Sequence, residues 1–270
     1  MEKLLVIKIG GNIIDDETRL SSFLKDFANI QSKKILVHGG GKLATKLAEK
    51  MGVEQKVVDG RRITDAETLK IVTMVYAGYI NKNIVALLQA NHCNAIGLSG
   101  ADGDAILAHK RKHPVMDYGF VGDIDNINSG LLKSLLDQHI AVVLAPITHD
   151  QQGQLLNTNA DTIAQEIAKA MSGLFETDLI YCFEKNGVLL DVNDESSAIK
   201  KLDRNYYEQL KSPRQPVGSG EAKIFAGMIP KLDNAFAALD SGVKKVIIGK
   251  AEHLEKLIEG NSGTTILNGK

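Results

Sequence analysis

The residues of this sequence that most clearly suggest chemistry are a lysine and two glycines near its start. Lys8 interrupts the apolar run of residues 4–9, and Gly10 and Gly11 follow that run directly. A strand buried on both faces excludes charge unless the charge serves a partner, and paired glycines let backbone N–H groups come close to an anion. We interpret the stretch as a phosphate cradle with a lysine at its edge. The alternative is an ordinary strand-to-helix turn whose lysine reaches solvent.

A second glycine cluster follows the next predicted strand. Residues 34–37 have the pattern of a short buried strand, which runs into His38 and Gly39–Gly41 before a helix predicted over 42–51. The carboxyl ends of neighbouring parallel strands face the same crevice. Two anion-binding turns should therefore lie side by side.

Two better-known glycine motifs can be compared with this cluster. A P-loop is excluded, because Leu43 stands where Ser or Thr is required and Leu36 where the first glycine is required. A dinucleotide-binding fingerprint fits better, because the cluster has G-x-G-x-x-A spacing up to Ala44 and Asp59 follows about twenty residues later. A dinucleotide-binding oxidoreductase therefore stays open as a remote alternative.

Further polar groups lie in loops beyond these turns. Arg61 and Arg62 offer two planar guanidinium groups to a carboxylate or phosphate, although a solvated loop would also explain them. Asn157, Asn159 and Asp161 are spaced so that a loop can present one amide while Asp161 enters the first turn of the next helix. Capping of that helix by Asn159 or Asp161 is the competing explanation.

Strands and helices that alternate along the chain must position these groups, and this alternation predicts an α/β fold with a parallel sheet. We expect strands over 4–9, 34–37, 95–98, 140–144, 179–183, 245–248 and 264–267. We expect helices over 15–30, 42–51, 65–91, 128–138, 203–210 and 221–241, and one that contains Asp161 and runs to 170. The helix over 65–91 is apolar on more than one face, which indicates a central position or an oligomer interface.

Three other segments have distinct patterns. Residues 212–220 are rich in proline and glycine and are the best candidate for a mobile loop or lid. Gly227 and Pro230 interrupt the predicted 221–241 helix, so Lys231 can begin a new helical stretch. His109 and His113 are four residues apart, but the cations between them and a following proline favour an exposed hairpin over a metal site.

Composition limits the possible partners. The 270-residue chain has 32 basic and 33 acidic residues and a net charge of -1, so it offers no general attraction to nucleic acid or anionic lipid. Cys93 and Cys182 are far apart and support neither a disulfide framework nor a thiolate metal site. No signal segment precedes the first strand and no apolar stretch is judged long enough to span a bilayer, so we expect a cytoplasmic protein that binds small molecules.

Five motifs together resemble the amino acid kinase family, in order and in approximate spacing, from the first strand to the last. They are Lys8–Gly11, His38–Gly41, Gly60–Thr64, Asn157–Asp161 and Gly227–Lys231. The resemblance implies an α/β fold, a three-layer αβα sandwich with a mainly parallel open central sheet. It also implies one domain over 1–270, with an N-lobe of about 1–172 for acylglutamate binding and dimerisation and a C-lobe of about 173–270 for ATP binding.

The sequence is most similar to family members that phosphorylate the γ-carboxylate of N-acetyl-L-glutamate with ATP, in arginine biosynthesis. That reaction needs no general base, because the nucleophile is already ionised at neutral pH. The resemblance implies that Lys8 and Lys231 stabilise the transferring phosphoryl group and that Asp161 holds both lysines. The other implied site residues bind substrate (Gly40, Gly41, Arg62, Asn157) or nucleotide (Gly10, Gly11, Glu184, Met228). Magnesium is expected on the nucleotide phosphates, without protein metal ligands.

Several alternatives remain within this resemblance. Arg61 stands where the family usually has an apolar residue, so the acyl group could carry its own carboxylate, as in N-succinyl-L-glutamate. Other kinases of the family, and a regulatory domain without turnover, are further possibilities. Only three residues precede the first strand, whereas arginine-inhibited relatives generally have an additional helix there. We therefore expect a homodimer, insensitive to arginine and joined through the 65–91 helix.

Overall fold

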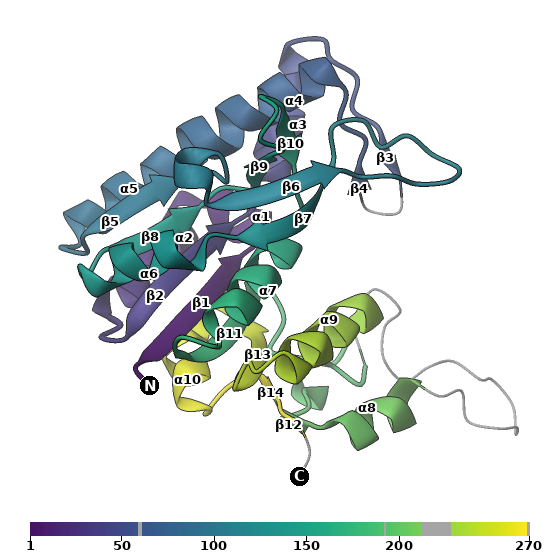
Figure 1. The fold of residues 1–270 in the computed structure, drawn as a ribbon. Helices are drawn as coiled ribbons and strands as arrows, with labels where there is room; N and C mark the ends of the chain where they lie inside the picture. The colour runs from purple at the N-terminus through teal and green to yellow at the C-terminus, as the bar shows by residue number, and fades with distance from the viewer. Residues whose placement is uncertain (59–60, 192, 212–227, 269–270) are drawn as a thin grey trace, which may run out of the picture.

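A computed structural model describes residues 1–58, 61–191, 193–211 and 228–268. Within these ranges a central sheet lies between two layers of helices (Figure 1). The predicted α/β class and the three-layer arrangement are therefore confirmed. The figure also shows a second, smaller group of strands beside the central sheet.

The central sheet has eight strands, and β1 (Lys3–Ile9) lies in its middle between β11 (Glu176–Phe183) and β2 (Lys33–His38). The other strands are β12 (Lys201–Leu202), β14 (Thr264–Ile266), β13 (Lys245–Lys250), β8 (Ala141–Leu144) and β5 (Ala95–Leu98). Each named pair is parallel except β13 with β14. The carboxyl ends of β1, β2 and β11 therefore meet at one edge.

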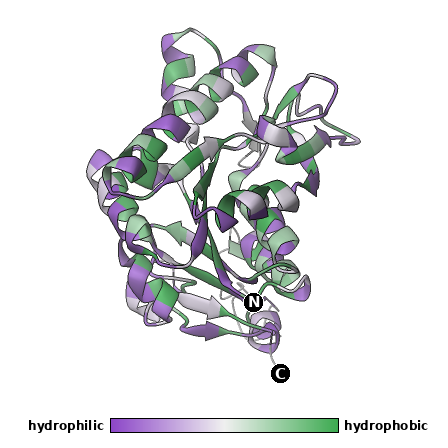
Figure 2. Cartoon of the chain, turned by 60° about the vertical axis from the view of Figure 1, so that its left-hand side comes forward, coloured by the Kyte–Doolittle hydropathy of each residue, from purple (hydrophilic) through white to green (hydrophobic). Residues whose placement is uncertain are grey.

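Successive side chains of β1 point to opposite faces of the sheet and pack into two separate hydrophobic cores. Leu4 and Val6 pack with one cluster, whereas Leu5 and Ile7 pack with the other, and all four are fully buried. The sheet strands are accordingly mostly apolar in Figure 2. Because Lys8 has the same parity as Leu4 and Val6, the strand directs its side chain toward the first of these cores.

The helices divide between the two cores. The Leu4 side has α6 (Ser129–Asp137), α7 (Ala160–Met171), α8 (Arg204–Lys211) and α9 (Ile229–Asp240). The Leu5 side has α1 (Gly11–Ile14), α2 (Glu17–Asn29), α3 (Gly41–Lys50), α4 (Ala66–Thr73), α5 (Asn81–Ala90) and α10 (Leu254–Glu259). Three short 3₁₀ turns are also present, η2 (Asp102–Asp104), η3 (Glu195–Ser197) and η5 (Ala251–His253).

The long helix predicted over 65–91 is present, but its middle is π-helical. The segment η1 (Met74–Ile80) joins α4 to α5, and Asp65 caps the start of α4 by accepting the N–H of Thr68. The wider π turns direct Tyr76 and Ile80 inward and leave Met74 and Tyr79 exposed. Sequence periodicity does not distinguish a π turn from an α turn in so apolar a segment.

One helix is long and apolar enough to span a bilayer by length and composition, so the expectation that no stretch could do so was wrong. Ala66–Ala90 forms a 25-residue helical stretch with a mean hydropathy of 1.4 in its most apolar window. Its inner residues Val72, Ile84 and Leu88 are fully buried against the sheet, and 44% of that window is buried. The apolar character of this helix thus fits a helix that packs on a sheet.

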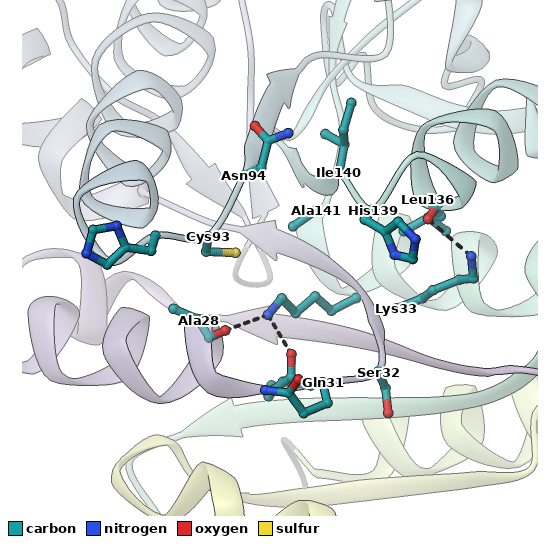
Figure 3. Close-up of a pocket in the computed structure, with 13 residues that line it drawn as sticks. Ala28, Gln31, Ser32, Lys33, Cys93, Asn94, Leu136, His139, Ile140 and Ala141 are labelled. Atoms are coloured by element: carbon teal, nitrogen blue, oxygen red, sulfur yellow. Dashed lines mark hydrogen bonds between the residues drawn. The ribbon is translucent and has the colours of Figure 1, made fainter.

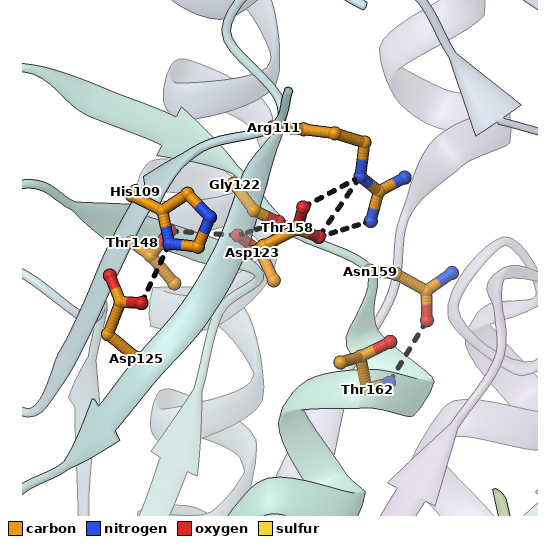
Figure 4. A network of polar contacts seen from close by, with 9 residues as sticks. All are labelled: His109, Arg111, Gly122, Asp123, Asp125, Thr148, Thr158, Asn159 and Thr162. Carbon is orange, nitrogen blue, oxygen red and sulfur yellow. Dashed lines mark hydrogen bonds and ion pairs between the residues drawn. The ribbon is translucent and has the colours of Figure 1, made fainter. Parts of the chain in front are cut away.

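The smaller sheet has the order β10 (Leu155–Asn157), β9 (Ile147–His149), β6 (Ile106–Lys110) and β7 (Gly122–Ile127). Strands β6 and β7 are antiparallel, which confirms the hairpin that the sequence predicts around His109 and His113. His109 contacts Asp125 at 2.7 Å, as Figure 4 shows. A separate two-stranded hairpin pairs β3 (Val57–Val58) with β4 (Arg61–Arg62).

Some predictions fall on residues that the structure does not describe. They are Asp59 of the dinucleotide-binding alternative, Gly60, the 212–220 loop, and the first part of the 221–241 helix with Gly227. The described part of that helix is α9, which starts at Ile229 with Pro230 in its first turn. Proline is well tolerated there because its missing N–H has no acceptor within the helix. Lys231 therefore lies at the start of a helix, as predicted.

Candidate active site

Lys8, Asp161 and Lys231 come together at the carboxyl end of β1. The ammonium nitrogen of Lys8 lies 2.6 Å from Oδ1 of Asp161, and that of Lys231 lies 3.7 Å from Oδ2. Lys8 comes from the end of β1, Asp161 from the first turn of α7, and Lys231 from the first turn of α9. One carboxylate thus holds two cations from distant parts of the chain at one point.

Capping of α7 explains why Asp161 is available for these lysines. Asn159 is the N-cap, and its side-chain oxygen accepts the N–H groups of Asp161 at 2.8 Å and Thr162 at 3.1 Å. Figure 4 shows the bond to Thr162. The competing explanation from the sequence, helix capping, therefore holds for Asn159. The Asp161 carboxylate is left to pair with the lysines.

Burial and charge act against each other in this cluster. Burial favours the protonated acid, but the positive charges of Lys8 and Lys231 outweigh it and hold the pKa of Asp161 below its ordinary value. Burial, together with the charge of Lys8, lowers the pKa of Lys231, and Asp161 opposes that change. The cluster has an ionised carboxylate at its centre.

Phe183 also contacts this cluster, although no sequence motif identifies it as a site residue. The Lys231 ammonium lies over the Phe183 ring, 4.5 Å from its centroid, at a distance suited to a cation–π interaction. Tyr181, two residues earlier on the same face of β11, donates its hydroxyl to the carbonyl oxygen of Asp161 at 3.3 Å. Strand alternation from Tyr181 was the signal that could have identified Phe183.

The two glycine turns lie side by side, as the sequence predicts. The N–H of Gly39 donates to the carbonyl of Ile9 at 3.1 Å, so the turn after β2 is bonded to the end of β1. A Cβ atom placed on Gly11 would lie 4.0 Å from the backbone nitrogen of Gly41, and one on Gly10 would lie 3.9 Å from the Lys8 ammonium. The two glycine turns and the Lys8 ammonium are therefore close neighbours, as an anion-binding site requires.

Gly40 requires the absence of a side chain for two reasons. Its φ angle is +151°, in a region that L residues rarely adopt. A Cβ atom there would collide with the δ-methyl group of Ile80 and lie 3.1 Å from the Tyr76 ring. The glycine turn is thus packed directly on the π-helical segment η1.

A buried histidine fixes the same turn. Nδ1 of His38 lies 2.8 Å from the carbonyl oxygen of Gly39, so Nδ1 carries the proton and donates it. Nε2 then accepts from the side-chain amide of Asn81 at 3.3 Å, and that amide also donates to the carbonyl of Val143 at 3.1 Å. Burial lowers the pKa of His38 to about 4, which keeps the ring neutral at physiological pH.

Arg62 lies beside the second glycine turn, and Asn157 is connected to it through Thr64. Nη2 of Arg62 donates to the carbonyl of Gly41 at 3.0 Å and to Oγ1 of Thr45 at 2.8 Å. Asn157 donates its side-chain amide to Oγ1 of Thr64 at 3.0 Å, and Thr64 in turn bonds the carbonyl of Arg62 at 3.3 Å. Arg62 thus lies at the first turn of α3, and Thr64 links Asn157 to Arg62.

Glu184 and Met228, which are predicted to bind nucleotide, make few contacts that would indicate a role. Glu184 is exposed in the turn after β11, and Met228 is half-buried at the N-cap of α9, where it packs against the core. Neither side chain has a hydrogen bond or an ion pair to the part of the chain that the structure describes. Glu184 nevertheless directly follows Phe183, and Met228 directly precedes the helix that carries Lys231.

A cavity of about 300 Å³ lies elsewhere, at the opposite edge of the sheet (Figure 3). Residues near the amino ends of β2, β5 and β8 line it, among them Lys34, Cys93 and His139. Lys34 donates to three carbonyl groups at the end of α2, those of Phe27, Ala28 and Ile30. Its ammonium therefore closes a helix end and is not directed to a ligand.

Comparison with known proteins identifies the family. The model of the amino acid kinase family matches residues 3–250. The chain belongs to the amino acid kinase family. A Cytophaga hutchinsonii relative named acetylglutamate kinase is 56% identical over 97% of this chain and 96% of its own. A Parabacteroides distasonis relative of the same name is 55% identical over 95% of this chain and 97% of its own. The resemblance stated from the motifs is confirmed.

Solved structures of this kinase fold agree with the architecture. The protein smu.665 of Streptococcus mutans has a TM-score of 0.76 at 26% identity, over 99% of each chain. The N-acetylglutamate synthase of Neisseria gonorrhoeae, complexed with coenzyme A and N-acetyl-glutamate, has a TM-score of 0.80 at 20% identity, over 100% of this chain and 60% of that one. Giardia carbamate kinase, at 14% identity over 99% of each chain, has a TM-score of 0.70.

We predict that Gly40→Ala lowers the free energy of unfolding by about 1–3 kcal/mol, because the new methyl group adds both strain and collision. Gly39→Ala is the matched control, since its Cβ atom would meet only ordinary contacts at 3.8 Å. Urea unfolding of the two variants measures the difference. Equal stabilities would contradict the tight packing of the Gly40 turn on η1.

Proposed function

We propose that this protein transfers the γ-phosphoryl group of ATP to the γ-carboxylate of N-acetyl-L-glutamate. The product is N-acetylglutamyl 5-phosphate, and the step belongs to arginine biosynthesis. The names of the relatives, with 56% and 55% identity over nearly the full chain, support this activity. The observation in the structure that carries the proposal is the pairing of Lys8 and Lys231 with Asp161 beside two glycine turns.

The chemistry requires positioning and charge stabilisation. A carboxylate is already ionised at neutral pH and attacks phosphorus without a general base. The transferring phosphoryl group carries negative charge that preorganised donors stabilise. In our proposal, the ammonium groups of Lys8 and Lys231 supply that charge from opposite sides, and Asp161 keeps both in place. The N–H groups of the glycine turns, at Gly10 and Gly40, add hydrogen bonds to the phosphoryl oxygens.

Substrate binding is assigned to the elements around the first turn of α3. Arg62 would bind the α-carboxylate of the acylglutamate, and Asn157 its acylamino group. Gly40 would let the reacting carboxylate approach the backbone, and Gly41 would leave room for the α-carboxylate beside Arg62. The hydrogen bonds from Arg62 to Gly41 and Thr45 support this assignment, because they hold the guanidinium group beside the first turn of α3.

Nucleotide binding is assigned mainly to the C-lobe, residues 173–270, with Glu184 and Met228 among its contacts, and Gly10 and Gly11 of the N-lobe would add contacts to the phosphates. The described residues contain no group of three His, Cys, Asp or Glu side chains that could hold a metal ion, and Asp161 is already paired. In our proposal, Mg²⁺ is held by the ATP phosphates, where it neutralises charge. The N-lobe, residues 1–172, would hold the acylglutamate.

A homodimer in the cytoplasm completes the proposal. Met74 and Tyr79 of η1 are 50% and 63% exposed, so the outer face of the long helix presents large apolar side chains. We expect the second copy to cover this face. Multi-angle light scattering of the purified protein should give twice the chain mass of 29.2 kDa, and a single chain mass would contradict the dimer.

N-succinyl-L-glutamate is a second candidate acceptor, because Arg61 lies next to Arg62 on β4 and adds a cation. A coupled assay of ADP release with N-acetyl- and N-succinyl-L-glutamate, L-glutamate, L-aspartate and carbamate tests both candidates. The proposed function predicts the highest kcat/KM with N-acetyl-L-glutamate. A strong preference for the succinyl compound would favour the second candidate, and turnover of neither acylglutamate would refute both.

We predict that Lys8→Ala and Lys231→Ala each lower kcat by about 100-fold or more, which is the effect of losing one preorganised donor to the transition state. Lys25→Ala on the exposed face of α2 is the control and should leave kcat unchanged. Steady-state kinetics at saturating ATP and acceptor measures these values. Near-normal kcat in both active-site variants would show that the lysines are not catalytic.

We predict that Arg62→Ala raises KM for N-acetyl-L-glutamate about tenfold or more, with a smaller change in kcat, because it removes ground-state binding of a carboxylate. Arg61→Ala is the matched variant on the same strand and should leave that KM unchanged. The same two variants assayed with the succinyl substrate show whether Arg61 contacts the acyl group. An unchanged KM for Arg62→Ala would contradict the assigned binding role.

A further inference from the structure

Tyr76 lies where the predicted substrate groups meet, although no motif identifies it. It belongs to η1, is only 5% exposed, and packs its ring on Gly40 with Cδ1 and Cε1 at 3.1 and 3.2 Å from the position of a Cβ atom. Its hydroxyl oxygen lies 4.0 Å from the corresponding Cβ position on Gly41. Nη2 of Arg62 lies 3.9 Å from that same point. A phenol and a guanidinium group therefore border one small space above the first residue of α3.

The chemistry of the two groups indicates what can occupy this space. Arg62 has only donors, so a hydroxyl beside it can accept from the guanidinium group but must direct its own proton to another acceptor. Burial raises the pKa of Tyr76, and Arg62 only partly opposes that rise, so the phenol keeps its proton at neutral pH. An anionic oxygen placed between the two groups would accept the phenol proton and, in exchange for the bond to Gly41 or Thr45, one Nη2 proton of Arg62.

The start of α3 adds to the attraction for an anion. The helix runs over ten residues from Gly41, and the N–H groups of its first turn have no partner within the helix. A carboxylate above Gly41 would thus meet the helix N-terminus, the Arg62 guanidinium and the Tyr76 hydroxyl together. The wider turn of η1 is what brings Tyr76 to this position, because it directs both Tyr76 and Ile80 toward Gly40.

We infer that Tyr76 is a substrate-binding residue that donates its hydroxyl proton to the α-carboxylate of the acylglutamate, beside Arg62. This inference rests on the proposed function. The long helix would then contact the substrate directly, in addition to packing on Gly40. Because the hydroxyl recognises one carboxylate, its contribution is specific to acceptors that carry that group.

Tyr76→Phe tests the inference, since it removes the hydroxyl and keeps the ring that packs on Gly40. KM for N-acetyl-L-glutamate should rise about 10- to 100-fold, the usual effect of losing a hydrogen bond to a charged group, while KM for ATP stays unchanged. Tyr79→Phe is the matched control, because Tyr79 is on the same segment and is 63% exposed. Its KM values for N-acetyl-L-glutamate and ATP should equal those of the wild type.

A ligand that lacks the α-carboxylate separates a specific contact from a general disturbance. N-acetyl-4-aminobutyrate keeps the acylamino group and the reacting carboxylate, so calorimetric binding of it should be equally weak in wild type and Tyr76→Phe. N-acetyl-L-glutamate should bind the variant about 10- to 100-fold more weakly than the wild type. Equal losses for both ligands would overturn the assignment to the α-carboxylate.

The outcomes also distinguish this inference from the function on which it rests. If the wild type phosphorylates N-acetyl-L-glutamate and Tyr76→Phe has the same KM, the inference fails and the proposed function stands. If the wild type phosphorylates no N-acylglutamate, both fail. A raised KM confined to the acylglutamate, with normal thermal unfolding of the variant, supports the inference.

Discussion

The ion pairs of Asp161 are the interaction on which the rest of the site depends. Two ammonium groups repel each other, and each would be costly to bring out of water without a counter-ion. A single carboxylate offsets both costs because it reaches Lys8 with one oxygen and Lys231 with the other. The side chain of Asp161 is 21% exposed, so solvent screens these attractions only partly. The arrangement holds positive charge ready at one point while the carboxylate itself stays ionised.

Every element around this point contributes through a simple geometric rule. Alternation along β1 directs Lys8 toward α7, and alternation along β11 directs Phe183 toward Lys231. Asn159 caps α7, which begins at Ala160, so Asp161 lies in the first turn of the helix. The parallel order of β11, β1 and β2 then puts the glycine turns at the same edge of the sheet. The fold thus converts local patterns into one convergent site.

The sequence predicted local features well and cross-chain contacts less well. The apolar period and the capping residues predicted α2, α3, α6 and the central-sheet strands other than β12 nearly to their ends, because these signals lie within a few residues, whereas the short β12 was missed. The meeting of Lys8 with Asp161 followed from the family resemblance and not from spacing. The π turns of η1, the ring of Phe183 and the hydroxyl of Tyr76 were missed, since each depends on which distant side chain packs opposite. The length and apolar composition of residues 66–90 were also underestimated. Burial against a sheet and burial in lipid require the same apolar residues, so composition alone does not distinguish the two.

The amide of Asn81 has a consequence for how the molecule moves. It is the first residue after the π-helical segment, and it ties His38 to the end of β8 while Ile80 and Tyr76 press on Gly40. The helix that we expect to join two copies and the turn that we expect to cradle phosphate therefore behave as one stiff unit. A second copy that covered the outer face of this helix, as we propose, would therefore contact the same element that packs on Gly40.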